Sequence, residues 1–244
     1  MTIKREQLLY YSIKYFGDYF KILKAISNNE NYYNVDYSVK YITIVDKDYP
    51  DNLRLLQYPP FVLYYKGDIN ILKYRGVSVV GSRICCDYSK DYALNMAKYL
   101  NDDIVIISGL AMGIDAYAHT SAIKYGNKTI GVIGCGLDVI YPIQNKDLYQ
   151  IMFDNHLVIS EYPLGVKPDK YHFPFRNRII AALGNKMIVL CATLKSGTMH
   201  SVNYALELNK DVYCLPHKVD CQFGKGCNYL ISCGAMIILD EKIE

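Results

Sequence analysis

The stretch that most constrains the fold is IVIISGLAMGIDAYAHTSAIKY, residues 104–125. It opens with a β-branched, apolar run at residues 104–107, which is typical of a strand buried on both faces. A turn of small residues follows, and apolar residues then recur at helical spacing from Ile114 to Tyr125. Asp115 falls in the first turn of this predicted helix, where a carboxylate suits the positive end of the helix dipole. The segment therefore predicts a strand, a tight glycine loop and a helix, and the backbone N–H groups at such a helix start can bind an anion.

The same alternation of apolar runs and polar, glycine-containing turns continues along the chain. Strands are predicted at residues 42–45, 61–65, 77–80, 104–107, 129–133, 157–159, 187–191, 211–215 and 235–239, with a further helix near residues 88–100. Strands that alternate with helical segments imply right-handed βαβ units and a mostly parallel sheet with helices on both faces. The predicted fold class is therefore α/β, and ligands are expected beyond the carboxyl ends of the strands.

The first 40 residues predict a short helical N-terminal region. Apolar residues can line one helix face before and after Gly17, and an asparagine-rich polar stretch at residues 27–34 follows. Such a small piece is too short for much of a core of its own, so we expect it to pack on the main domain or on a partner. Residues 41–244 are then expected to form the α/β domain.

The overall composition limits where the chain works and what it binds. The 27 Lys and Arg residues against 24 Asp and Glu residues give a formal net charge of +3, so any nucleic-acid surface should be local. The N-terminus lacks the apolar segment of a signal peptide, and no apolar run approaches the ~20 residues of a membrane-spanning helix. The sequence thus predicts a soluble, cytoplasmic protein without membrane contact.

The 8 cysteines raise the question of disulfides or a metal. Several sit in or beside apolar runs, where cysteine behaves as a small hydrophobic residue. The chain has no C-x-x-C motif, and Cys221, Cys227 and Cys233 recur at a spacing that is not a standard zinc pattern. The cysteines are therefore predicted to be reduced and not to ligate a metal.

Two common phosphate-binding signatures are absent from the loops. No G-x-G-x-x-G follows the strand at residues 77–80, and GCGLD at residues 134–138 lacks the third glycine. The chain also has no G-x-x-x-x-G-K-[ST] sequence. A bound NAD or nucleoside triphosphate is disfavoured, and no cofactor is predicted.

Basic residues at two places favour another ligand. Arg83 follows a strand-end glycine and serine, where its planar guanidinium can hold a phosphate beside exposed backbone amides. The stretch KPDKYHFPFRNR, residues 167–178, interleaves cations with aromatic rings. Single-stranded nucleic acid needs cations for its phosphates and aromatic faces for its bases, each stacked base contributing about 1–3 kcal/mol. The alternative is a packed helix start with ordinary surface arginines.

An ordered set of motifs resembles a known family. The chain reads VVGSR at residues 79–83, SGLAMGID at 108–115, GCGLD at 134–138, SEYP at 160–163 and FPFRNRII at 173–180. In this order they are similar to the motifs of the DNA-processing protein A family, DprA or Smf, and the likeness extends over residues 41–238. The resemblance implies an extended Rossmann-like domain that binds and protects single-stranded DNA. It also implies a homodimer that helps to load the recombinase RecA in natural transformation or recombination.

Carried over motif by motif, the resemblance assigns the contacts with DNA. The expected residues are Arg83 as the phosphate clamp with Ser82 beside it, Lys170 and Phe173 as charge and base-stacking contacts, Arg176 and Arg178 lining or bracing the same pocket, and Ser108, Gly109, Ser196 and Gly197 as backbone or hydroxyl donors.

Two departures from the family pattern stand out. Met112 replaces a usual arginine, which removes one positive charge from the predicted site. The sequence ends at Glu244, so the winged-helix-like C-terminal module of many members is expected to be absent.

An enzymatic alternative rests on a few polar residues. Asp115 and His119 share a helix face, and with Glu161 and Ser108 they could form an acid–base site. Related Rossmann-like families that cleave nucleotide N-glycosidic bonds carry P-G-G-x-G-T-x-x-E, whereas residues 194–199 read LKSGTM. We therefore predict a non-enzyme in which Asp115 bonds backbone amides and His119 is a packed brace. A nucleotide-ligand sensor or N-glycosidic hydrolase is the alternative function.

Overall fold

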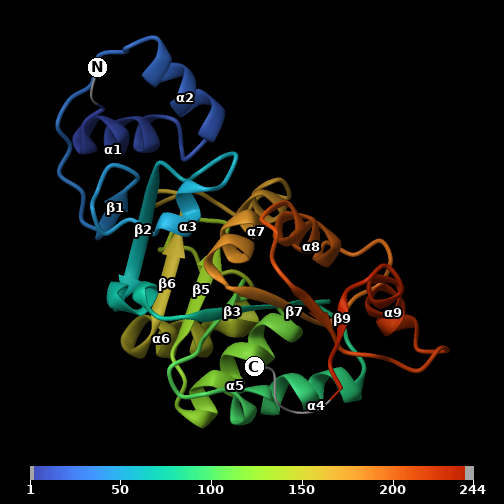
Figure 1. Ribbon diagram of the computed structural model, residues 1–244. Coiled ribbons are helices and arrows are strands. Elements are labelled where there is room, and N and C mark those ends of the chain that lie inside the picture. The colour runs from blue at the N-terminus through green and yellow to red at the C-terminus, as the bar shows by residue number, and fades with distance from the viewer. Residues whose placement is uncertain (1–2, 240–244) are drawn as a thin grey trace.

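The computed structural model describes residues 3–239 and has the predicted α/β architecture (Figure 1). Its strands are β1 Tyr41–Thr43, β2 Val62–Gly67, β3 Gly76–Gly81, β4 Val105–Ser108, β5 Thr129–Ile133, β6 Leu157–Ser160, β7 Lys186–Cys191, β8 Val212–Cys214 and β9 Met236–Ile237. Its α-helices are α1 Arg5–Lys14, α2 Tyr19–Ser27, α3 Asp51–Arg54, α4 Asp87–Asn95, α5 Ile114–Tyr125, α6 Lys146–Asn155, α7 His172–Leu183, α8 Thr198–Glu207 and α9 Lys225–Ser232. Short 3₁₀ helices are η1 Ile69–Lys73, η2 Met96–Tyr99, η3 Ile143–Asn145 and η4 Gln222–Gly224. Every predicted strand is found within a few residues of its expected place.

The strands form a single sheet in the order β1-β2-β6-β5-β4-β3-β7-β8-β9. From β6 to β9 each neighbouring pair is parallel, whereas β2 is antiparallel to both β1 and β6. The mostly parallel sheet of an extended Rossmann-like fold is thereby confirmed.

Helices cover both faces of this sheet (Figure 1). Neighbouring residues of β4 show the division: Ile107 packs in the core beneath α7, α8 and α9, while Ile106 packs in the core beneath α4 and α5. Both side chains are buried, which explains why the strand has no polar alternation.

The order of the strands reverses at β3, which lies between β4 and β7. The connections that follow β3 and β7 therefore leave the sheet on opposite sides. Crevices at the carboxyl ends of parallel strands form at such a point, and ligands of this fold class bind there.

The N-terminal helices α1 and α2 pack against one end of the sheet, as expected (Figure 1). Leu8 and Ile22 are buried in a cluster with Val62 of β2, and the Tyr64 hydroxyl of the same strand donates to Ser12 at 2.9 Å. The predicted break at Gly17 is also found, because Gly17 has a φ of +74° and a Cβ there would lie 3.0 Å from a neighbouring backbone oxygen.

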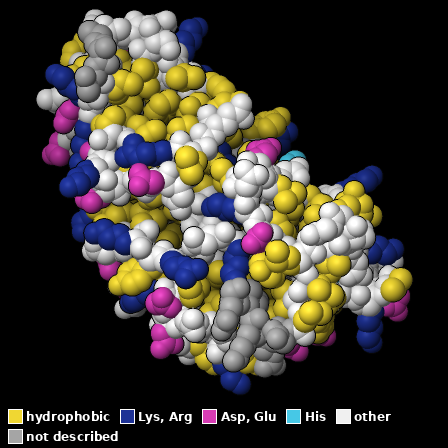
Figure 2. Space-filling view, viewed as in Figure 1, with side chains coloured by type: hydrophobic (Ala, Val, Ile, Leu, Met, Phe, Trp, Pro, Cys, Tyr) yellow, Lys and Arg dark blue, Asp and Glu magenta, His cyan; other side chains and the backbone are white. Residues whose placement is uncertain are grey.

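The predicted helix near residues 88–100 divides into α4 and η2. Within residues 3–239, no helix has the length and apolar character needed to cross a membrane. The face in Figure 2 carries hydrophobic side chains around the N-terminal helices and scattered charges of both signs elsewhere. This face offers no uniformly basic surface, which agrees with the small net charge.

Candidate functional site

A groove of about 1050 Å³ lies at the carboxyl ends of the parallel strands, lined by the connections that follow β3 to β7. The predicted site residues that line it are Ser82, Arg83, Lys170, Phe173, Arg176, Ser196 and Gly197. A small adjoining cavity is lined by Gly109 and shares Arg83, Phe173 and Arg176 with the groove. The structure therefore brings most of the predicted residues to one place, although their segments are far apart in sequence.

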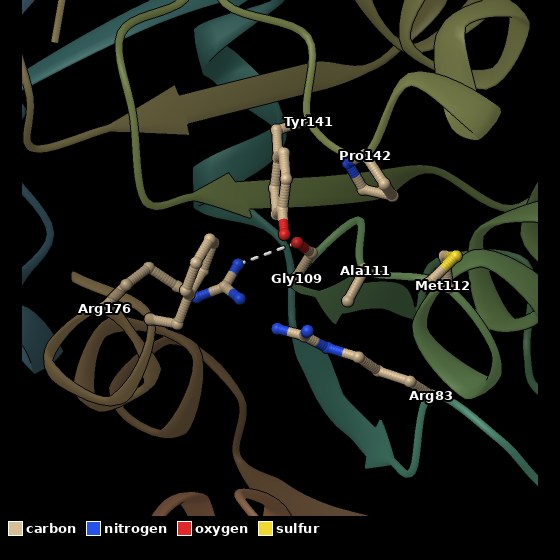
Figure 3. A pocket seen from close by; sticks show the side chains of 8 residues that line it. Arg83, Gly109, Ala111, Met112, Tyr141, Pro142 and Arg176 are labelled. Carbon is tan, nitrogen blue, oxygen red and sulfur yellow. Dashed lines mark hydrogen bonds between the residues drawn. The ribbon is translucent and has the colours of Figure 1, made fainter. Parts of the chain in front are cut away.

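A cation and two aromatic rings lie together in the lining of the small cavity. The Arg83 guanidinium carbon lies 5.6 Å from the centroid of the Phe173 ring. Phe173 in turn stacks on Tyr141, with ring centroids 5.4 Å apart and an interplanar angle of 28°. Figure 3 shows Arg83 extending from the loop after β3 toward Arg176, with Tyr141 across the cavity. An exposed cation beside stacked rings can hold a phosphate and a planar base together.

Further cations line the groove in the segment before α7. Lys167 and Lys170 are exposed, and the Lys170 ammonium lies 4.9 Å from the Tyr171 ring centroid. Long exposed side chains of this kind can follow a flexible anionic backbone without a fixed geometry.

Two serine hydroxyls in the groove lack a hydrogen-bond partner. The Oγ atoms of Ser82 and Ser196 are buried and unpaired among the described residues. A buried hydroxyl without a partner costs free energy, and a polar ligand atom would relieve that cost. Ser82 follows β3 and Ser196 follows β7, so the two hydroxyls come from the ends of the two adjacent strands where the strand order reverses.

The hydroxyl of Ser108 and the N–H of Gly109, expected as donors to a ligand, are already used in hydrogen bonds within the protein. The fully buried Ser108 hydroxyl donates to the Val79 carbonyl at 2.6 Å. The Gly109 N–H donates to Asp115 Oδ2 at 3.1 Å. These donors therefore hold the strand ends and the start of α5 together, as expected for Asp115.

Arg176 forms the floor of the small cavity and is only 5% exposed. Its guanidinium donates to the Gly109 carbonyl at 2.8 Å and to the Val132 carbonyl (Figure 3 shows the first bond). A Cβ at position 109 would lie 2.6 Å from both terminal nitrogens of Arg176, so the close approach requires glycine. Burial raises the pKa of Asp115 and lowers that of Arg176, and the attraction between the two opposes both shifts.

Arg178 lines neither the groove nor the small cavity, so of its two expected roles, lining or bracing the pocket, the structure contradicts the first. It is 1% exposed and forms an ion pair with Glu161 at 2.6 Å. It also donates to the carbonyls of Tyr58 and Phe175, at 2.8 and 2.9 Å. Helical geometry explains the difference, because residues two apart on α7 point in different directions.

The residues of the enzymatic alternative are held in structural contacts. His119 is fully buried and its Nδ1 lies 2.7 Å from the Thr129 hydroxyl. Because Thr129 donates its proton to the Ile106 carbonyl, His119 Nδ1 carries the proton of this bond. Burial lowers the pKa of His119 to about 3, so the ring is neutral at physiological pH. His119 is thus the packed, hydrogen-bonded brace that the sequence predicts.

The structure adds groove residues to which the sequence analysis gave no role. They include Tyr141, Asn177, Thr193 and Phe223. Tyr141 lies three positions after the GCGLD segment that follows β5, so the gathering of loops at the strand ends could have pointed to it. Phe223 lies in η4, beyond β8, and no sequence pattern places it near Arg83. Met112 is 40% exposed and lines the small cavity.

One group of side chains has the composition of a metal site. Cys86, His217 and Cys221 lie together, with their potential ligand atoms all within 4.8 Å of one another. The absence of C-x-x-C and the spacing of the C-terminal cysteines predicted no metal ligand, but local spacing cannot reveal this group because Cys86 and His217 are 131 positions apart.

Comparison with known proteins decides the family. The model of DNA recombination-mediator protein A matches residues 40–243 of this chain. The chain belongs to this family. Within the DNA recombination-mediator protein A family, the chain is 42% identical over 196 residues to DNA processing protein DprA of Streptococcus pneumoniae, covering 80% of this chain and 70% of that relative. The resemblance noted in the motifs is confirmed.

Two solved structures of DNA recombination-mediator protein A relatives share the fold. The X-ray structure of DprA from Streptococcus pneumoniae aligns with a TM-score of 0.84 at 36% identity, over 98% of this chain and 92% of that one. A structure of DNA processing protein A from Helicobacter pylori aligns with a TM-score of 0.76 at 32% identity, over 84% of this chain and 93% of that one. The second concerns the single-stranded DNA binding mode of the Helicobacter pylori protein.

Proposed function

We propose that this chain binds single-stranded DNA along the groove at the carboxyl ends of its strands. The observation that carries the proposal is the Arg83 guanidinium 5.6 Å from the Phe173 ring, which itself stacks on Tyr141. In this proposal Arg83 holds a phosphate, and bases stack on the exposed ring of Tyr141 or insert beside Phe173. Membership of a DNA-processing family and the single-stranded DNA binding of the Helicobacter pylori relative support it.

The groove suits an extended ligand better than a compact one. Its volume of about 1050 Å³ is at or above the upper end of the range typical of small-molecule pockets. Lys167 and Lys170 add positive charge along it, and the unpaired hydroxyls of Ser82 and Ser196 add donors on its floor. These features support contacts spread over several nucleotides.

Ser108, Gly109, Arg176 and Arg178 act indirectly in this proposal. Their polar groups are used in bonds within the protein, so they fix the shape of the groove instead of reaching the DNA. Direct contacts are left to Arg83, Lys170, Phe173, Ser82 and the loop of Ser196 and Gly197.

The test is fluorescence anisotropy with a labelled oligo-dT and a matched duplex at two salt concentrations. We expect salt-sensitive binding to the single strand, and Arg83→Glu should weaken it by about tenfold or more because a charged hydrogen bond to phosphate is lost. Arg75→Glu is the matched control, since Arg75 is also exposed and lies at the opposite end of β3. Equal binding by wild type and Arg83→Glu would overturn the proposal, and stabilisation by mononucleotides alone in a thermal shift would favour the nucleotide-ligand alternative.

We further propose that the chain acts as a homodimer and helps to load RecA on single-stranded DNA. Family membership supports both statements. Light scattering at micromolar concentration tests the dimer, and a monomer mass would contradict it. RecA loading is measured on DNA coated with single-strand-binding protein, where wild type should accelerate filament formation and Arg83→Glu should not.

A further inference from the structure

Three side chains from separate segments converge beside the groove. Cys86 directly precedes α4, His217 follows β8, and Cys221 directly precedes η4. One potential ligand atom of each residue lies within 4.8 Å of those of the other two, and Cys86 Sγ is 3.9 Å from His217 Nδ1. Tetrahedral zinc, with bonds of about 2.3 Å to sulfur and about 2.0 Å to nitrogen, holds its ligand atoms roughly 3.5–3.8 Å apart. Small side-chain movements would therefore bring the group to binding distance.

The histidine of this group is already oriented as a metal ligand. His217 Nε2 lies 3.1 Å from the Leu190 carbonyl oxygen, which can only accept, so Nε2 carries the proton. The lone pair of Nδ1 then points toward Cys86. A ligating histidine usually donates its other N–H to a carbonyl or carboxylate in this way.

The backbone around the histidine is fixed as well. The His217 N–H donates to Asn228 Oδ1 at 3.0 Å, and Asn228 Nδ2 donates back to the His217 carbonyl at 2.9 Å. Gly224 packs so closely that a Cβ there would lie 2.0 Å from the imidazole ring. The imidazole therefore has little freedom to turn away from the two thiols.

We propose that Cys86, His217 and Cys221 bind a soft divalent cation, for which zinc is the natural candidate. Two thiolates and an imidazole favour zinc over magnesium or calcium, which prefer oxygen ligands. Three protein ligands leave one position of a tetrahedral site for water or another group. All three residues are partly exposed, so an ion can enter from solvent.

The site would join two loops of the groove wall. Cys86 lies three positions after Arg83, and Cys221 lies two positions before Phe223, and both Arg83 and Phe223 line the groove. Bound zinc would thus fix the loop that carries Arg83 against the loop that carries Phe223. This role concerns the shape of the groove, and metal binding itself does not depend on the proposed DNA binding.

The test is titration of the full-length, metal-free chain with cobalt(II) in the presence of a phosphine reductant that keeps the thiols reduced. We expect the cobalt–thiolate charge-transfer band to saturate at one equivalent per chain and to be abolished by added zinc. Cys86→Ser, Cys221→Ser and His217→Asn should each weaken or lose the band. Cys85→Ser is the matched control, because Cys85 adjoins Cys86 but is not part of the group, and it should bind as wild type does.

Metal content of the purified proteins gives a second readout. Elemental analysis after growth with added zinc should find one zinc per wild-type and Cys85→Ser chain and a loss in the three ligand variants, with circular dichroism reporting their folding. A wild-type chain that shows no thiolate band and retains no zinc would overturn the proposal whatever the variants do. Undiminished binding by folded Cys86→Ser and Cys221→Ser would also overturn it.

Discussion

Arg178 donates to Glu161 at 2.6 Å, and the two side chains are only 1% and 5% exposed. The pair joins α7 to the segment after β6, and further bonds from Arg178 reach the carbonyls of Tyr58 and Phe175. The guanidinium also lies 3.7 Å from the Phe175 ring centroid. Arg178 thus makes its contacts inside the protein, although the segment around it is rich in cations and aromatic rings.

Arg178→Met should therefore be strongly destabilising. It leaves the Glu161 carboxylate buried without its partner, which costs about 3–5 kcal/mol of the free energy of unfolding. Urea unfolding measures the loss. Adding Glu161→Leu to Arg178→Met should recover part of it, because the second change removes the unpaired charge.

The control for this prediction is an exposed ion pair. Lys21 and Asp18 lie 3.4 Å apart with side chains 66% and 40% exposed, so Lys21→Met should change the free energy of unfolding by less than about 1 kcal/mol. Similar losses for Lys21→Met and Arg178→Met would contradict the structural role of the buried pair.

Phe173→Ala should weaken binding of oligo-dT by about 5- to 150-fold, the equivalent of about 1–3 kcal/mol for one stacked base. Since no charge is removed, the dependence of affinity on salt should keep its slope. Anisotropy at several salt concentrations measures both quantities. Tyr74→Ala is the control, because Tyr74 is 57% exposed and does not line the groove. Unchanged affinity in Phe173→Ala would remove this ring from the binding surface.

Much of this architecture could be predicted because it depends on local sequence. Buried parallel strands such as β4 come from apolar runs, here residues 104–107, and the residues that follow such strands must gather at one sheet edge. That reasoning placed Arg83 at the sheet edge, the family resemblance added Phe173 and Ser196, and the structure brings all three to one groove.

The remaining features depend on the direction in which a side chain points and on contacts between segments that are far apart in the chain. Whether Arg178 points into the groove or into the core is decided by how α7 sits on the sheet, which its sequence does not encode locally. The Ser108 hydroxyl donates to the Val79 carbonyl of the neighbouring strand, and this partner is known only once the strands are paired. The Cys86, His217 and Cys221 group depends in the same way on β3 and β7 being adjacent, with β8 beyond them.

Met112→Arg should tighten single-stranded DNA binding at low salt. Met112 lines the same small cavity as Arg83, so a cation there is within reach of a phosphate held by Arg83. Each added phosphate contact should steepen the slope of log affinity against log salt by about 0.7. Ile151→Arg on α6 is the control, because Ile151 is 41% exposed against 40% for Met112 and lies outside the groove. An equal effect of both variants would show only a general gain from positive charge.

Burial of His119 should make folding stability depend on pH in the mildly acidic range. The pKa of His119 falls from 6.5 to about 3 on folding, so the unfolded chain binds more protons than the native one below pH 6.5. The stability that comes from keeping His119 neutral is therefore fully present above pH 6.5 and is lost as the pH falls toward 3. From pH 7 to pH 5, His119 alone should lower the free energy of unfolding by about 2 kcal/mol.

His119→Asn tests this dependence, because the Asn side-chain N–H₂ can keep the bond to Thr129 without titrating. Urea unfolding at pH 7, 6 and 5 should show a shallower decline in the variant than in wild type, whatever the variant loses at pH 7 through its smaller side chain. His200→Asn, at an exposed position, should decline as wild type does. The pKa of the buried His156 falls to about 4, so some acid sensitivity remains in every variant. The effect of His119 is therefore the difference between the slopes of wild type and His119→Asn. Parallel slopes for wild type and His119→Asn would mean that His119 is solvated and protonated in the folded protein.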